Sequence, residues 1–239
     1  MLELNSVSKY FGGLAAVHDV SLTVQEGEFT GLIGPNGSGK TTLFNVITGV
    51  LKPTAGRITF GGKDITGFLP DKICHSGIGR TFQVPKPFKS LSVVDNIKAG
   101  LLFGKSAAYV DEDPDQEAYK LMELVGLKVD EPTTPNELNI IDLRRLELAR
   151  ALATRPRLLL LDEVMSGLTQ AEISEASRVL NKIRKEWGIT IIWVEHIMGA
   201  LMNLVERVII LQFGEVLAEG KPSEVSKDKR VIEAYLGKE

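Results

Sequence analysis

The feature of this sequence that most constrains its fold is a glycine-rich loop between a predicted strand and a predicted helix. Residues 29–33 form a short apolar run, residues 34–41 read GPNGSGKT, and a helical pattern follows as far as Gly49. The loop fits the pattern G-x-x-x-x-G-K-[ST], and its context disfavours a chance glycine turn. Glycines let successive backbone N–H groups point at phosphate oxygens, and the helix N-terminus adds partial positive charge. The sequence therefore predicts a phosphate-binding loop, in which Lys40 reaches the β- and γ-phosphates and Thr41 ligates Mg²⁺.

A second motif places acidic residues at the end of another predicted strand. Residues 158–161 are consecutive leucines, as in a parallel strand buried on both faces, and Asp162 and Glu163 follow directly. Phosphates bind at the carboxyl edge of such a sheet, so Asp162 is expected to hold Mg²⁺ through water, and Glu163 to orient or deprotonate an attacking water. A further apolar strand, residues 190–194, precedes His196. A histidine placed there can contact a γ-phosphate, although its position alone leaves a structural role open.

The order of predicted elements indicates an α/β protein with a helical insertion. Residues 2–24 alternate apolar and polar side chains, which is typical of half-buried strands. Patterns from about residue 85 to residue 154 are helical, and the last third returns to alternating strands and helices. Helices are predicted from the cap residue Ser92 onward and over residues 116–125, 143–153 and 171–186. We predict one domain over residues 1–239, with a core of residues 1–84 and 155–239 and an inserted helical subdomain of residues 85–154.

Composition excludes several classes of protein. The chain has 239 residues, and 28 Lys+Arg against 31 Asp+Glu give a formal net charge of −3, which argues against nucleic-acid binding through bulk positive charge. The single cysteine, Cys74, cannot form an internal disulfide and fits a reducing compartment. No apolar run approaches the roughly 18 residues of a membrane helix, and the N-terminus lacks the features of a signal peptide. If the protein acts at a membrane, it is therefore expected to do so from the membrane surface.

Taken in order, these motifs resemble the ATP-binding subunits of ABC transporters over essentially the whole chain. The resemblance implies a P-loop NTPase core of the ABC type: a mixed sheet with helices, an N-terminal antiparallel β region and the helical insertion. It implies that Gln83 is the Q-loop glutamine that senses Mg²⁺ and the membrane subunit, that Glu163 is the catalytic glutamate and that His196 is the switch histidine. Phe11 matches the aromatic residue that stacks on adenine. Tyr10 is the alternative, and a core role is open for both.

The expected ligands are ATP and Mg²⁺. The residues expected to bind the nucleotide are Phe11, Gly34, Pro35, Asn36, Gly37, Ser38, Gly39, Lys40, Thr41 and Thr42. The expected catalytic residues are Lys40, Gln83, Glu163 and His196, and the expected metal ligands are Thr41, Gln83 and Asp162.

Several segments resemble the branched-chain amino-acid importer ATPases in particular. These are residues 79–83 (GRTFQ), 194–196 (VEH) and the ending at 231–237 (VIEAYLG). This resemblance implies a peripheral ATPase at the cytoplasmic face of the plasma membrane, docked through residues 83–90 on separate permease subunits. It also implies an ATP-sandwich dimer and an indirect partner, a solute-binding protein, with no role for nucleic acid.

Some positions depart from the family pattern. The signature Leu-Ser-Gly-Gly-Gln is expected at residues 138–142, where this chain has LNIID. Ile140 and Ile141 replace glycines whose bare backbone lets a γ-phosphate approach, and Asp142 adds a negative charge. Val164 replaces a proline, and Thr169 replaces an aspartate of a loop that communicates across the dimer. In the family the signature acts on the partner's nucleotide, so the changes at residues 140–142 favour a heterodimer with unequal sites over a homodimer.

Other functions remain as alternatives. The degenerate signature also fits a weakly hydrolysing regulatory subunit, and the chain resembles, less closely, the ATPase of lipopolysaccharide export. A soluble ABC ATPase acting on DNA or ribosomes is disfavoured by the acidic balance and by the absence of a coiled-coil insert or tandem domain. A GTPase is disfavoured because no Asn-Lys-x-Asp motif is present; residues 181–184 read NKIR.

Overall fold

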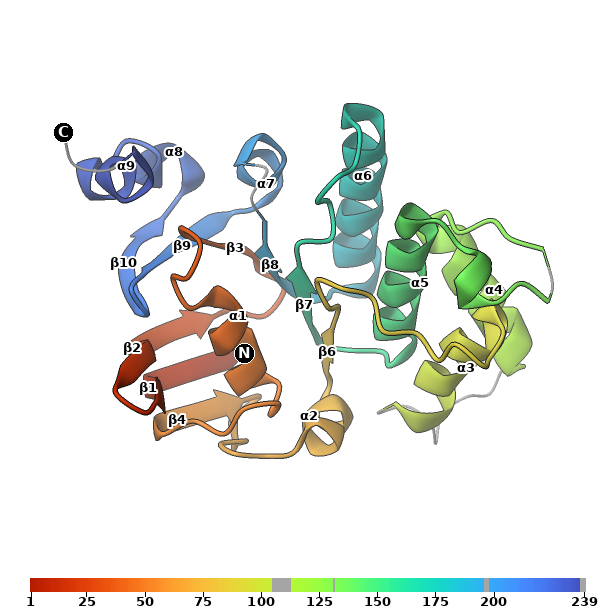
Figure 1. The fold of residues 1–239 in the computed structure, drawn as a ribbon, viewed down its shortest axis with the longest axis horizontal. Helices are drawn as coiled ribbons and strands as arrows, with labels where there is room; N and C mark the ends of the chain where they lie inside the picture. The colour runs from red at the N-terminus through yellow and green to blue at the C-terminus, as the bar shows by residue number, and fades with distance from the viewer. Residues whose placement is uncertain (105–112, 131, 196–197, 237–239) are drawn as a thin grey trace. The chain divides into compact units, whose positions relative to one another are not determined.

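The computed structural model describes residues 1–104, 113–130, 132–195 and 198–236, and the chain divides into two compact units. The first unit comprises Met1–Ile73 and Thr190–Glu239, and the second comprises Cys74–Ile189. In Figure 1 the first unit carries the red, orange and blue ends of the colour scale, and the second runs from yellow through green to cyan.

One sheet of the first unit is antiparallel. Its strands are β1 (Leu2–Phe11), β2 (Leu14–Val24), β4 (Ala55–Phe60) and β5 (Lys63–Asp64), in the order β2-β1-β4-β5. Leu4 of β1 lies opposite Leu22 of β2, and both are buried. The alternating pattern thus places its apolar side chains on one face, which confirms the predicted antiparallel N-terminal region.

The other strands of the first unit belong to a second sheet, which contains both parallel and antiparallel pairs. They are β3 (Phe29–Ile33), β8 (Thr190–Val194), β9 (Arg207–Gln212) and β10 (Glu215–Gly220), in the order β10-β9-β3-β8. β3 pairs in parallel with β8 and β9, and all residues of β3 and β8 are buried. The helices of this unit are α1 (Lys40–Ile47), α7 (Met198–Leu204), α8 (Pro222–Val225) and α9 (Lys229–Leu236). A Cβ on Gly31 would lie 2.7 Å from Leu201, so glycine lets α7 pack against β3.

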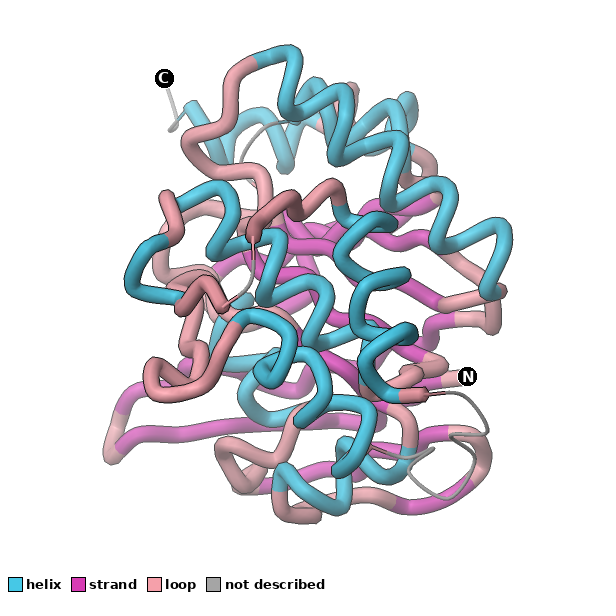
Figure 2. Tube along the Cα trace, turned by 90° about the vertical axis from the view of Figure 1, so that its right-hand side faces the viewer, coloured by secondary structure: helices cyan, strands magenta, loops and turns pink. Residues whose placement is uncertain are grey.

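The second unit combines a strand pair with packed helices. β6 (Ile78–Arg80) pairs in parallel with β7 (Leu158–Asp162). The helices are α3 (Val93–Phe103), α4 (Pro114–Val125), α5 (Ile140–Ala153) and α6 (Gln170–Trp187), with a 3₁₀ turn, η2, at Pro135–Glu137. α3, α4 and α5 contact one another. Figure 2 shows helices, drawn in cyan, facing the viewer. α3 and α5 approach closely because residue 100 is glycine: a Cβ there would lie 2.7 Å from the Cβ of Ala153.

The structure confirms the predicted α/β class with an antiparallel N-terminal region, and it refines several elements. Ser92 caps α3 as predicted, since its Oγ accepts the N–H of Asp95 at 3.0 Å. α5 begins at Ile140, three residues before the predicted start at Leu143. The short elements α2 (Pro70–Ser76), β6, α8 and α9 were not predicted. Residues 85–154 lie inside the second unit, which also holds β6, β7 and α6, so the separate helical subdomain stays a prediction.

The single cysteine lies in α2, which contains the boundary between the units. Cys74 is half-buried, and burial raises the pKa of its thiol, although a hydrogen bond with the Thr154 side chain opposes this rise. Among the helices in the described ranges, none is long and apolar enough to cross a membrane.

Candidate functional site

The glycine-rich loop of the first unit connects β3 to α1, as the sequence predicts. Gly34 and Gly39 have φ values of 157° and 105°, and Cβ atoms there would lie 2.1 Å from the carbonyl oxygen of Leu211 and 2.4 Å from that of Ala16. Glycine is therefore required at both positions by backbone conformation and by space. Over residues 39–43, all of them described, no side chain caps α1 and no acidic residue lies in its first turn. The N–H groups of this turn are thus suited to an anion.

Lys40 is folded back into this loop. Its side chain is buried, and its Nζ donates to the carbonyl oxygens of Gly34 at 2.8 Å and Pro35 at 3.0 Å, and to Ser38 Oγ at 3.4 Å. The ammonium group therefore lies inside the loop, and Thr41 and Thr42 follow Lys40 in the first turn of α1. An ammonium group in a loop at a helix N-terminus favours binding of phosphate.

A contact that sequence reasoning missed joins this loop to the C-terminal helix α9. The backbone N–H of Gly34 donates to the hydroxyl of Tyr235, and burial raises the pKa of that hydroxyl while this bond opposes the rise. Tyr235 belongs to the ending that the resemblance singled out, but nothing in its local pattern links it to residue 34.

Two neighbouring aromatic residues at the end of β1 have different surroundings. The Tyr10 hydroxyl is hydrogen-bonded to His18 Nδ1 at 2.7 Å, and its ring meets the His18 ring edge-on. The Phe11 ring is 47% exposed, and Lys9 Nζ lies 5.3 Å from its centroid. Of the two residues, Phe11 is the more exposed.

In the second unit, β7 ends at the two predicted carboxylates. Asp162 is buried, and its Oδ2 accepts a hydrogen bond from Arg80 Nη2 at 3.0 Å. The Asp162 backbone N–H donates to Thr81 Oγ1 at 3.1 Å. Glu163 has a left-handed φ of 51°, and its Oε2 accepts a hydrogen bond from Gln83 Nε2 at 2.7 Å. The segment from Arg80 to Gln83 therefore contacts both carboxylates.

Arg80 is a residue that sequence reasoning did not assign. Burial lowers the pKa of its guanidinium, while the hydrogen bond and the charge of Asp162 oppose this shift. The guanidinium also lies 4.8 Å from the centroid of the Phe82 ring. The pair joins residues 82 positions apart, so only the parallel pairing of β6 with β7 reveals it.

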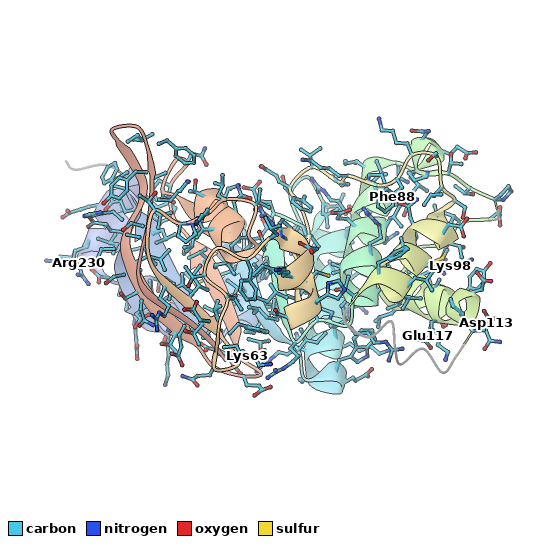
Figure 3. All side chains as sticks on the ribbon, turned by 90° about the horizontal axis from the view of Figure 1, so that it is seen from below. Lys63, Phe88, Lys98, Asp113, Glu117 and Arg230 are labelled. Carbon is cyan, nitrogen blue, oxygen red and sulfur yellow. The ribbon has the colours of Figure 1, made fainter. Side chains whose placement is uncertain are left out.

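The segment that follows Gln83 is held by α5. Glu147 of α5 is 5% exposed and accepts from Arg150 Nη1 at 2.8 Å, and the same Nη1 donates to the carbonyl oxygen of Lys86 at 2.9 Å. The Arg150 guanidinium lies 4.9 Å from the centroid of Phe88, which Figure 3 shows on the segment before α3. Burial raises the pKa of Glu147, and Arg150 and the N–H groups of Lys86 and Phe82 oppose this.

The signature position forms the capped N-terminus of α5. Asn139 Oδ1 accepts the N–H groups of Ile141 and Asp142, each at 2.9 Å, and Asn139 Nδ2 donates to Asp142 Oδ2 at 2.7 Å. Arg145 Nη1 donates to Asp142 Oδ1 at 3.1 Å. The N–H groups that would bind an anion are thus satisfied within the chain, and the Asp142 charge is offset by Arg145.

Thr169, another of the departures, is the N-cap residue of α6. Its Oγ1 accepts the N–H of Glu172 at 3.4 Å, and Glu172 Oε2 accepts the N–H of Thr169 at 2.7 Å. Threonine therefore supplies a helix cap at a position where the family has aspartate, another good cap residue.

The predicted site residues fall in both units. Phe11 and residues 34–42 belong to the first, while Gln83, Asp162 and Glu163 belong to the second. His196 lies outside the described residues. The structure brings Lys40 together with its own loop, and Gln83 together with Glu163.

The predicted metal ligands are of the kinds that Mg²⁺ prefers. A threonine hydroxyl, an amide oxygen and a carboxylate are hard oxygen donors. The described part of the chain contains no group of three or more His, Cys, Asp or Glu that could hold a metal ion by itself. The donors therefore fit a Mg²⁺ ion bound mainly through nucleotide phosphates, and do not fit a metal cage built from protein alone.

The chain is similar to transport proteins over nearly its whole length. A family model described as ABC transporter matches residues 17–166, and one described as branched-chain amino acid ATP-binding cassette transporter matches residues 215–239. The high-affinity branched-chain amino acid transport ATP-binding protein LivG of Salmonella typhimurium is 36% identical, covering 99% of this chain and 98% of that protein. Its counterpart BraF of Pseudomonas aeruginosa is 35% identical, with the same shares covered.

Solved structures agree with this relationship. A nucleotide-free ATP-binding cassette from an ABC transporter has a TM-score of 0.88 and 31% identity, covering 100% of this chain and 99% of that chain. A dimeric cassette in a post-hydrolysis state, bound to ADP and phosphate, has a TM-score of 0.84 and 30% identity, covering 93% of this chain and 99% of that chain.

Proposed function

Because the chain belongs to the ABC transporter family of ATP-binding proteins, we propose that it is the ATP-hydrolysing subunit of an importer for branched-chain or related amino acids. The observation that carries the ATPase assignment is the loop at residues 34–41, with buried Lys40 held inside it. The choice of amino acid rests on the printed functions of LivG and BraF and on the match at residues 215–239.

In this proposal the loop and Lys40 bind the β- and γ-phosphates, and Phe11 stacks on adenine. Thr41, Gln83 and Asp162 hold Mg²⁺, which offsets the negative charge of the phosphates. Glu163 orients or deprotonates the attacking water, and Lys40 and His196 stabilise charge that develops on the γ-phosphate. The hydrogen bond from Gln83 to Glu163 Oε2 implies that this bond opens, or that Oε1 serves as the base.

Replacing Lys40 tests the assignment. Lys40→Ala removes the ammonium group from the loop, so ATP affinity should fall by about tenfold or more, on the scale of a lost charge-assisted hydrogen bond. ATP-driven uptake by the assembled transporter should be abolished. The measurements are calorimetric ATP titration and solute uptake into vesicles, with Lys63→Ala on exposed β5 as the control (Figure 3). An unchanged ATP affinity in Lys40→Ala would show that the loop is not the nucleotide site.

The proposed partners follow from the same role. Permease subunits dock against residues 83–90, where Val84 and Phe88 are exposed large hydrophobic residues. A solute-binding protein acts only indirectly, and nucleic acid is not a partner. The protein then works as a peripheral subunit at the cytoplasmic face of the plasma (inner) membrane.

We further propose a head-to-tail dimer with ATP between the chains, and a heterodimer in preference to a homodimer. Each nucleotide would lie between one chain's phosphate loop and the other chain's signature. Asn139 caps the N–H groups of the signature position, and Ile140 is 56% exposed where glycine would let a phosphate approach. A homodimer would carry this weakened contact at both sites, and a heterodimer would carry it at one.

The capped signature also favours a second candidate, a weakly hydrolysing regulatory subunit. The two candidates differ in one measurable quantity, the ATPase rate of the assembled transporter. A rate that depends on Glu163 supports the hydrolysing subunit, and a rate that is independent of Glu163 supports the regulatory one.

A further inference from the structure

We propose that Arg80 is a positioning residue for the metal-binding carboxylate: its guanidinium fixes the Asp162 side chain so that the carboxylate is oriented for the nucleotide-bound Mg²⁺ ion. This inference rests on the proposed function, because it takes Asp162 as a metal ligand. It assigns Arg80 a role through Asp162, with no contact of its own to the nucleotide.

The first support is the geometry of the pair. Arg80 Nη2 lies 3.0 Å from Asp162 Oδ2, and the two side chains are only 6% and 2% exposed. A carboxylate buried to this extent needs a positive partner, and a buried pair is held more firmly than one at the surface. Because the hydrogen bond is made to Oδ2, it also fixes the direction in which Oδ1 of the same carboxylate points.

The second support is that Arg80 itself has little freedom to move. Its Cα is paired with that of Leu160 in the parallel β6–β7 register, and the next N–H, that of Thr81, donates to the Leu160 carbonyl oxygen at 3.0 Å. The Phe82 ring lies against the guanidinium, with 4.8 Å between the guanidinium carbon and the ring centroid. The pairing of β6 with β7 and the contact with the Phe82 ring therefore restrict the Arg80 side chain, which in turn binds Asp162.

The third support is that two consecutive residues, Arg80 and Thr81, both form hydrogen bonds with Asp162. Thr81 Oγ1 accepts the N–H of Asp162 while Arg80 binds its carboxylate, so consecutive residues fix the backbone and the side chain of Asp162. Groups that orient a metal ligand in this way strongly affect metal affinity without touching the metal. A planar guanidinium is better suited to this task than an ammonium group.

The test measures how much Mg²⁺ tightens ATP binding. For each variant, the dissociation constant of ATP is determined by calorimetry with Mg²⁺ and again with EDTA, and the ratio of the two constants is taken. Arg80→Met should lower this ratio by about tenfold or more, the scale on which outer-shell partners of metal ligands act. ATP affinity in EDTA should not change. Arg80→Lys should give a ratio between those of the wild type and Arg80→Met, and it replaces Arg80→Met if that variant does not fold.

The controls separate this inference from the proposed function. Arg57→Met removes an exposed ion pair of the antiparallel sheet and should leave the ratio unchanged. Asp162→Asn should lower the ratio, and the double variant Asp162→Asn/Arg80→Met should lower it no further, because Arg80 acts through Asp162. If Asp162→Asn leaves the ratio intact, the metal assignment fails. If Asp162→Asn lowers the ratio but Arg80→Met leaves it unchanged or raises it, the role of Arg80 is overturned while the ATPase assignment stands.

Discussion

At the scale of single residues, the aromatic pair at the end of β1 makes the most direct prediction about nucleotide binding. Phe11→Ala should raise the KM for ATP more than it lowers kcat, because stacking on the base is present in both the ground state and the transition state. The expected loss of ATP-binding free energy is on the order of 1–3 kcal/mol, by analogy with stacking of bases on aromatic side chains. Steady-state ATPase rates at varied ATP concentration measure it.

Tyr10→Ala is the matched control for that prediction. Its hydroxyl and ring are engaged with His18, so this change should leave the KM for ATP near the wild-type value. A raised KM in Tyr10→Ala with no effect in Phe11→Ala would identify Tyr10 as the stacking residue.

The same scale shows what the sequence can and cannot reveal about the site. Lys40, Asp162 and Glu163 were recognisable because each belongs to a motif whose spacing is fixed by one strand and its following loop. Arg80 was not recognisable, because its partner lies on a strand that is distant in sequence. Tyr235 was missed for the same reason, since its contact with Gly34 spans almost the whole chain. A local sequence pattern identifies functional residues that lie together in one segment. Contacts between residues of distant segments can be identified only from the folded structure.

At the scale of elements, the structure explains why α5 begins earlier than predicted. Ile140 and Ile141 are β-branched and lower helix propensity, so the predicted helix began at Leu143. Asn139 overrides this preference, because its Oδ1 accepts the N–H groups of both Ile141 and Asp142. The long elements with clear periodicity were predicted well, whereas β6 has only three residues and offers too little pattern.

The buried carboxyl group of Glu147 in α5 makes the stability of the protein depend on pH. Burial raises its folded-state pKa above the ordinary value of 4.5, so between these two values the folded state binds more protons than the unfolded state. The free energy of unfolding should therefore fall as pH rises from 4.5 through the folded-state pKa. The Glu147→Gln variant has no ionisable group at this position, so its unfolding free energy lacks this pH-dependent contribution.

Urea denaturation at a series of pH values measures the effect. The difference in unfolding free energy, wild type minus Glu147→Gln, should decrease as pH rises above 4.5. Asp115 is half-exposed and forms an ion pair with Lys98, so Asp115→Asn serves as a surface control. A difference that stays constant or increases with pH contradicts the prediction for Glu147.

At the scale of the whole molecule, the capped signature predicts unequal ATP sites in the assembled transporter. In the proposed heterodimer, this chain's Lys40, Asp162 and Glu163 face the partner's intact signature. Glu163→Gln should then remove most ATPase activity, by about a hundredfold at this site, the usual scale for loss of a general base. The matching glutamine substitution in the partner should remove less, since that site faces the capped N-terminus of α5.

The measurement is the ATPase rate of the transporter reconstituted with each variant in turn. Equal losses from the two substitutions would contradict unequal sites. A fully active transporter assembled with this ATPase as the sole nucleotide-binding subunit would also contradict the heterodimer.

The state of Cys74 has a practical consequence for spectroscopy. The chain has no second cysteine, and the thiol of Cys74 is half-buried with a raised pKa, so little of the reactive thiolate exists at neutral pH. A maleimide dye or nitroxide label should therefore react preferentially with a cysteine introduced on the surface. Pairs of such labels, one in each compact unit, would report the distance between the units with and without nucleotide, and the native thiol would not first have to be removed.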